Sequence, residues 1–131
     1  PRAGSQGLCS LLPRNGHLMG KFETNEDHPG RWHRPVCVPI GKEDVFGSAL
    51  EMLEDLSRWS VRSVDKDGLS ATYERNNGPL RGTSTIVVRV EGPDGLPNSQ
   101  THCSSQSDGG LLSRDKSNVA EFIQKFWMRV T

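Results

Sequence analysis

The sequence predicts an α+β domain in which two amphipathic helices flank a four-stranded antiparallel β-meander, in the order α-β-β-β-β-α. Three observations predict it. Residues 82–90 form the densest β-branched run and alternate with period two, which places Ile86, Val88 and Val90 on one face. Apolar residues recur at helical spacing before and after the strand region. Glycine, proline and asparagine turn signals separate the predicted strands.

The domain is predicted to occupy residues 41–131, behind an irregular N-terminal arm at residues 1–40. The arm is rich in glycine, proline, arginine and histidine and has no sustained period, a composition typical of disorder. Prolines hold residues 35–40 extended, which suits an edge or a lead-in and not a central strand. An arm of this kind, if ordered, must lie on its own domain or on a partner.

The first helix is predicted over residues 43–57, with Glu43 and Asp44 in its first turn, where the helix dipole favours negative charge. The final helix has the strongest amphipathic pattern of the chain. It is predicted to start at Asp115 or Ser117, either of which can cap a helix. Both helices are expected to cover the same face of the sheet.

Three more strands are predicted around the run at residues 82–90. Residues 59–64 and 69–74 alternate and are joined by a hairpin signal that ends in Gly68. Residues 99–105 form a weaker fourth strand of small polar residues. The sheet face away from the helices carries serine, threonine, arginine and glutamate, so it is expected to be wet or covered by the arm.

Composition excludes several classes of function. The chain has 131 residues, enough for one domain, and 33% of them are hydrophobic, which predicts a modest core. The 16 basic and 16 acidic residues give no electrostatic footprint for nucleic acid. No apolar run approaches the ~20 residues of a transmembrane helix. The chain starts at Pro1, which is interpreted as a processed or truncated N-terminus.

The three cysteines, Cys9, Cys37 and Cys103, are too widely spaced for a disulfide framework. Reduced thiols and a Cys37–Cys103 bridge both remain open. Zinc or copper ligands could be drawn from His28, His33 and Cys37, with His102 and Cys103 brought in by folding. Because these spacings match no compact ligand motif, no metal and no other cofactor is predicted.

No catalytic set is predicted, and the chain is therefore expected not to be an enzyme. His102 and Cys103 are adjacent in a strand and point to opposite faces, and neither a nucleophile elbow nor a phosphate-binding glycine motif is present. The alternative is a small-ligand-binding protein or hydrolase-like enzyme that uses the polar sheet face. That alternative requires one pocket that collects Tyr73, Arg75, Arg89 and His102.

A partner-binding site is predicted in the arm. Trp32 lies between two arginines in a proline-bounded segment, and tryptophan and arginine dominate binding hot spots. The predicted partner-binding residues are Phe22, Arg31, Trp32, His33, Arg34 and Pro35. In the alternative interpretation, Trp32 folds back onto the second sheet face of its own domain.

The C-terminal two-thirds of the chain resembles the domain-of-unknown-function family 1499. The resemblance is carried by Ser84-Thr-Ile-Val-Val-Arg-Val90, by the serine-rich strand Thr101-His-Cys-Ser-Ser-Gln-Ser107, and by the turn Asp108–Gly110 that leads to Asn118 in the last helix. Pro35-Val-Cys-Val38 is faintly similar to an early segment of that family. The arginines of the family's serine-rich strand are replaced here at Thr101 and Gln106. The chain is more weakly similar to PsbP-type luminal proteins of photosystems.

These resemblances imply a fold and a plastid or bacterial setting, and they transfer no catalytic residue. Together with the coreless arm, they predict a non-catalytic accessory subunit or assembly factor of a larger protein complex, docked through the arm. The specific expectation is a peripheral subunit of an organelle photosynthetic membrane complex such as a photosystem. Its expected partners are protein subunits, in a plastid or thylakoid-associated location, with no nucleic acid and no transmembrane segment.

Overall fold

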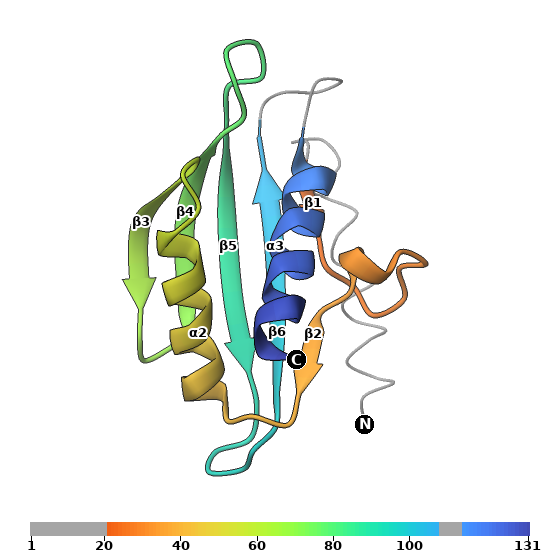
Figure 1. The fold of residues 1–131 in the computed structure, drawn as a ribbon, viewed down its shortest axis with the longest axis vertical. Coiled ribbons are helices and arrows are strands. Elements are labelled where there is room, and N and C mark those ends of the chain that lie inside the picture. Colours follow the sequence, from red (N-terminus) through yellow and green to blue (C-terminus); the bar gives the residue numbers. More distant parts are fainter. Residues whose placement is uncertain (1–20, 108–113) are drawn as a thin grey trace.

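In the part of the chain that the structure describes, the sheet has six strands, and two helices lie over it (Figure 1). The computed structural model describes residues 21–107 and 114–131. The strands are β1 (Lys21–Glu23), β2 (Val36–Val38), β3 (Trp59–Asp65), β4 (Ser70–Asn76), β5 (Thr83–Glu91) and β6 (Ser99–Gln106). The helices are the 3-10 turn η2 (Arg31–His33), α2 (Lys42–Glu54) and α3 (Asp115–Val130). The fold class is thus α+β, as predicted.

The strand order is β1-β6-β5-β4-β3, and every neighbouring pair is antiparallel. β3, β4, β5 and β6 form the predicted meander. β5 lies between β4 and β6, and its buried residues are Ser84, Ile86, Val88 and Val90. The predicted alternation of this strand is therefore confirmed, and it fixes which face of the sheet is the core.

Both helices cover that buried face, as predicted (Figure 1). α2 buries Val45, Phe46, Ala49, Met52 and Leu53, and α3 buries Val119, Phe122, Ile123 and Phe126. These side chains meet the inward residues of β4 and β5 in one hydrophobic cluster. No helix within the described residues is long and apolar enough to cross a membrane.

The prediction of four strands is wrong, because β1 and β2 also pair with β6. β1 pairs with Ser104–Gln106 of β6, and β2 pairs with Ser99–Thr101 of the same edge. Each is three residues long, which is too short for alternation to be recognised in the sequence. The prediction that residues 35–40 form an edge is confirmed. Residues 21–40 therefore lie on their own domain.

Two glycines give a testable contrast in stability. Gly47 is exposed inside α2, and a Cβ there would have open space. We expect Gly47→Ala to raise the free energy of unfolding by about 1 kcal/mol, because alanine loses less backbone entropy in a helix. At Gly92 a Cβ would collide with the backbone carbonyl of Asn98, so Gly92→Ala should lower it by about 2 kcal/mol. Urea unfolding measures both changes in the free energy of unfolding. If both variants are stabilised, or both destabilised, the packing at one of the two glycines is contradicted.

Candidate functional site

The predicted partner-binding residues lie beside the last helix. η2 packs against α3, and Trp32 is half-buried against the hydrophobic core. Trp32 therefore folds back onto its own domain, but onto the helix and not onto the second sheet face. The guanidinium carbon of Arg31 lies 4.8 Å from the ring centroid of Trp32 and 5.2 Å from that of Trp127 on α3. Two indoles thus hold one exposed arginine by cation–π contacts.

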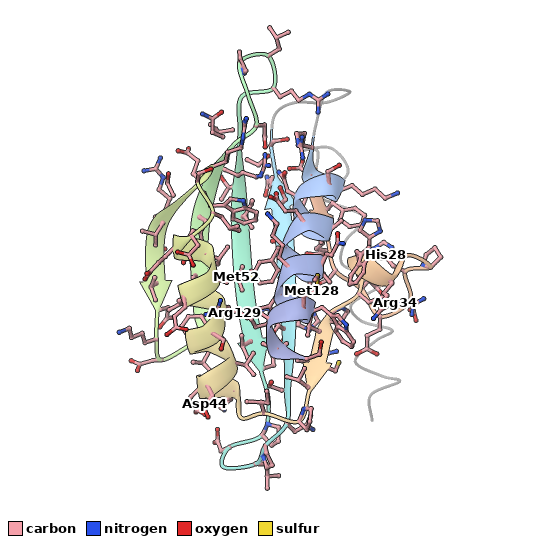
Figure 2. The ribbon with its side chains drawn as sticks, viewed as in Figure 1. His28, Arg34, Asp44, Met52, Met128 and Arg129 are labelled. Carbon is pink, nitrogen blue, oxygen red and sulfur yellow. The ribbon has the colours of Figure 1, made fainter. Side chains whose placement is uncertain are left out.

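Arg34 is held by backbone carbonyls. Its Nε donates to the carbonyl of His28 over 2.7 Å, and its Nη2 donates to that of Pro29 over 3.1 Å. Figure 2 shows His28 and Arg34 on the segment between β1 and β2, which projects beside α3. Two bonds to one guanidinium restrict the side chain while its charge stays at the surface.

Three rings form the base of this segment. Phe22 stacks on His28 with centroids 4.9 Å apart and meets His33 edge-on at 5.0 Å. Burial lowers the pKa of His33, and the positive charge of Lys116 on α3 and the neighbouring His28 lower it further. Phe22 and His33 therefore pack beneath the segment between β1 and β2, and Pro35 connects η2 to β2. Of the predicted set, Arg31 and Arg34 are exposed, and Trp32 is half-buried beside Arg31.

Met128 extends this surface along the helix. It is 71% exposed. It lies between Trp127, which faces η2, and Arg129, whose guanidinium bonds Glu51 of α2 over 2.9 Å, so its side chain points outward. Figure 2 shows it on the outer side of α3. We call Arg31, Trp32, Arg34, Trp127 and Met128 the tryptophan–arginine surface.

A second polar cluster, which the sequence did not predict, lies under the first turn of α3. Asp115 is 3% exposed, and its carboxylate accepts hydrogen bonds from the hydroxyls of Ser84 (3.1 Å), Ser105 (2.6 Å) and Ser107 (2.9 Å). The residue that precedes the helix is Arg114, with no side-chain capping bond. The prediction that Asp115 or Ser117 caps the helix is therefore wrong: the sheet serines engage Asp115 instead.

The cluster continues toward β4 through buried side chains. Arg75 donates to Glu121 over 3.1 Å and to Asn77 over 3.1 Å, and Asn77 donates to Ser84 over 2.8 Å. Asn118 of α3 donates to Asn77 and to Ser105. Burial lowers the pKa of Arg75, an effect that Glu121 opposes. These hydrogen bonds join the N-terminal half of α3 to the sheet.

The pocket required by the ligand-binding alternative is not assembled. Tyr73 and Arg75 face the helices and are almost fully buried, whereas Arg89 and His102 pair with each other on the opposite face. The sheet lies between the two pairs. Cys103 faces the core, opposite to its neighbour His102, as expected for adjacent strand residues.

The described residues offer no group of three or more metal-ligating side chains. Cys37 pairs in register with Gln100 on the outer face, whereas Cys103 is buried on the inner face, where burial raises the pKa of its thiol. A Cys37–Cys103 bridge is therefore excluded by geometry. Cys9 lies outside the described residues.

No family model and no curated protein matches the chain. Among solved structures, the crystal structure of Ara h 8.0201 is similar, with a TM-score of 0.48 and 9% sequence identity, over 85% of this chain and 99% of that chain. A likeness of that size transfers neither a ligand nor a partner. The resemblance to the domain-of-unknown-function family 1499 stays a prediction.

Proposed function

We propose that the chain is a non-catalytic accessory subunit that binds a partner protein through the tryptophan–arginine surface. The observation that carries the proposal is Arg31, an exposed guanidinium held between the rings of Trp32 and Trp127. Arginine and tryptophan are the side chains most enriched in binding hot spots. Trp32 and Trp127 pack against the core, whereas Arg31 and Arg34 stay exposed beside them, and this exposure supports binding.

Preorganisation supports the same proposal. Binding costs free energy when flexible side chains are immobilised, by about 0.5–1.5 kcal/mol for each. Arg31 is already held by two rings and Arg34 by two carbonyls, so most of that cost is met before a partner arrives. An arginine that served only solubility would need no such restraint.

A peripheral subunit of an organelle photosynthetic membrane complex remains the specific form of the proposal. It rests on the resemblance to family 1499 and to PsbP-type proteins. Binding of a small ligand is the alternative, and it now needs a site other than the divided set of Tyr73, Arg75, Arg89 and His102.

Site-specific photo-crosslinking tests the proposal. A photoreactive phenylalanine analogue replaces Met128, and in a matched control it replaces Leu80, which is 86% exposed in the loop between β4 and β5. Each full-length variant is irradiated in a gentle extract of the source organism. We expect one discrete protein adduct from position 128 that is absent from position 80, and Trp32→Ala should remove it.

Equal adducts from both positions, or none from position 128, would overturn the proposal. A species that then migrates alone near 14.5 kDa, and whose melting temperature rises with a small molecule, would favour the ligand-binding alternative.

A further inference from the structure

We propose that the segment of the partner that binds the tryptophan–arginine surface is an acidic peptide, whose carboxylates pair with Arg31 and Arg34. This inference rests on the proposed function and specifies the chemistry of the partner. Five cations elsewhere pair with acidic side chains, namely Lys42 with Asp94, Arg62 with Glu74, Arg89 with Glu91, Lys125 with Glu121 and Arg129 with Glu51.

Arg31 and Arg34 differ from these cations. Neither forms an ion pair with a carboxylate of the described residues. Two acidic residues occur in the same segment, yet Glu26 accepts from Gln100 of β6, and Asp27 pairs with neither arginine. Within the described residues, Arg58, Lys66 and Arg81 are also exposed and form no ion pair. What distinguishes Arg31 and Arg34 is that rings or carbonyls hold each guanidinium in place.

The way each guanidinium is held leaves donors for a carboxylate. The rings of Trp32 and Trp127 contact Arg31 at 4.8 and 5.2 Å from their centroids, which engages the π-system of the guanidinium and leaves the N–H groups at its edge available. Arg34 uses Nε and Nη2 on the two carbonyls, so its Nη1 donors remain. A carboxylate accepts such a fork through two parallel hydrogen bonds.

Lys116 extends the positive surface along α3. It is exposed in the first turn, and its charge reaches the segment, because it contributes to the lowered pKa of His33. Lys116 precedes Trp127 by about three helical turns and lies on the same side of the helix, roughly 16 Å away. An extended peptide of about five residues covers that distance. The surface therefore fits a short extended segment with several carboxylates.

A binding titration tests this inference. The probe is a synthetic ten-residue peptide that alternates glutamate and glycine, and the matched probe replaces each glutamate with glutamine. Binding to the full chain is followed by tryptophan fluorescence, since Trp32 and Trp127 lie at the site. We expect the glutamate peptide to bind at least about tenfold more tightly than the glutamine peptide, and its affinity to fall as salt rises.

Variants locate the binding. Arg31→Gln and Arg34→Gln should each weaken the glutamate peptide about tenfold. Arg81→Gln, at an exposed arginine in the loop between β4 and β5, should leave the affinity unchanged. Equal binding of both peptides, or an equal loss in Arg81→Gln, would overturn the inference. Tighter binding of an oligothymidylate than of the glutamate peptide would also overturn it, in favour of a nucleic acid.

The two proposals fail separately. In one outcome, position 128 captures a partner, but the chain binds the glutamate and glutamine peptides equally. That result overturns the acidic chemistry alone. In the other outcome, the chain prefers the glutamate peptide and needs Arg31 for that preference, but no protein is captured. That result supports the acidic chemistry and overturns the accessory-subunit proposal.

Discussion

Asp115→Ala is expected to lower the free energy of unfolding by about 4 kcal/mol. The carboxylate of Asp115 is buried and accepts from three serine hydroxyls on two strands. Each hydrogen bond to a charged group contributes roughly 1.5–3 kcal/mol. Alanine would leave buried hydroxyls of Ser84, Ser105 and Ser107 without this acceptor and would loosen the first turn of α3 from the sheet.

Asp44 provides the matched control. It is exposed in the first turn of α2, so Asp44→Ala removes only the attraction between a carboxylate and the helix N-terminus (Figure 2). That loss should be about 0.5 kcal/mol. Asp115→Asn keeps one acceptor oxygen and should cost about 2 kcal/mol. Urea unfolding of the three variants measures the series. If Asp115→Ala and Asp44→Ala cost the same, the serine cluster does not hold α3 to the sheet.

The elements that the sequence predicted are those whose pattern is local. Ile86 and Val88 identify β5 because apolar residues alternate with polar ones along a single strand. Phe122 and Phe126 identify α3 because one helix face is continuously apolar. In both cases the buried residues are hydrophobic, and neighbours in sequence are enough to reveal the side that faces the core.

The polar cluster eluded prediction because its buried residues are not hydrophobic. Ser105 and Ser107 continue the inward face of β6, yet a strand of small polar residues is interpreted from sequence as a wet one. Their burial depends on Asp115, which belongs to α3 and not to the sheet. A buried carboxylate with serine partners shows no period in the sequence, so only the fold brings the group together.

The residues of the tryptophan–arginine surface could be brought together only in part from the sequence, for a similar reason. The arginines beside Trp32 are visible in one short segment, and their residue types indicate an interface. The second ring over Arg31 belongs to Trp127, which comes 95 residues after Trp32. Without that ring the arginine would be an ordinary mobile cation. In the structure Trp32 packs on α3 of its own domain while Arg31 stays exposed, and docking on a partner stays a prediction.

Acid is expected to destabilise the fold by about 3 kcal/mol between pH 6.5 and pH 4 through His102 alone. The pKa of this histidine is lowered to about 4, mainly by burial and also by the charge of Arg89, against a smaller opposing effect of Glu26. Its Nδ1 lies 3.3 Å from the hydroxyl of Thr24, which follows β1. The native state therefore keeps His102 neutral at a pH where the unfolded chain already binds a proton.

The loss of stability in acid follows from that difference in proton binding between the folded and unfolded states. Well above pH 6.5 both states are unprotonated at His102, and its pKa shift has little effect on stability. As the pH falls from 6.5 to about 4, only the unfolded state gains the proton, so the free energy of unfolding decreases. Below the folded pKa both states carry the proton and the loss levels off. His33 acts in the same direction because its pKa is also lowered.

His102→Gln separates this effect from the protonation of carboxylates, which both proteins share. Glutamine keeps a polar group opposite Thr24 and cannot titrate, so the variant should lose about 3 kcal/mol less than the natural chain between pH 7 and pH 4 in urea unfolding. His33→Gln is the comparison for the second histidine, and its benefit should add to the first, because the two sites have no described contact. Parallel stability curves for the natural chain and His102→Gln would mean that His102 accepts a proton in the folded state as readily as in the unfolded one. The turn after β1 would then leave it open to water.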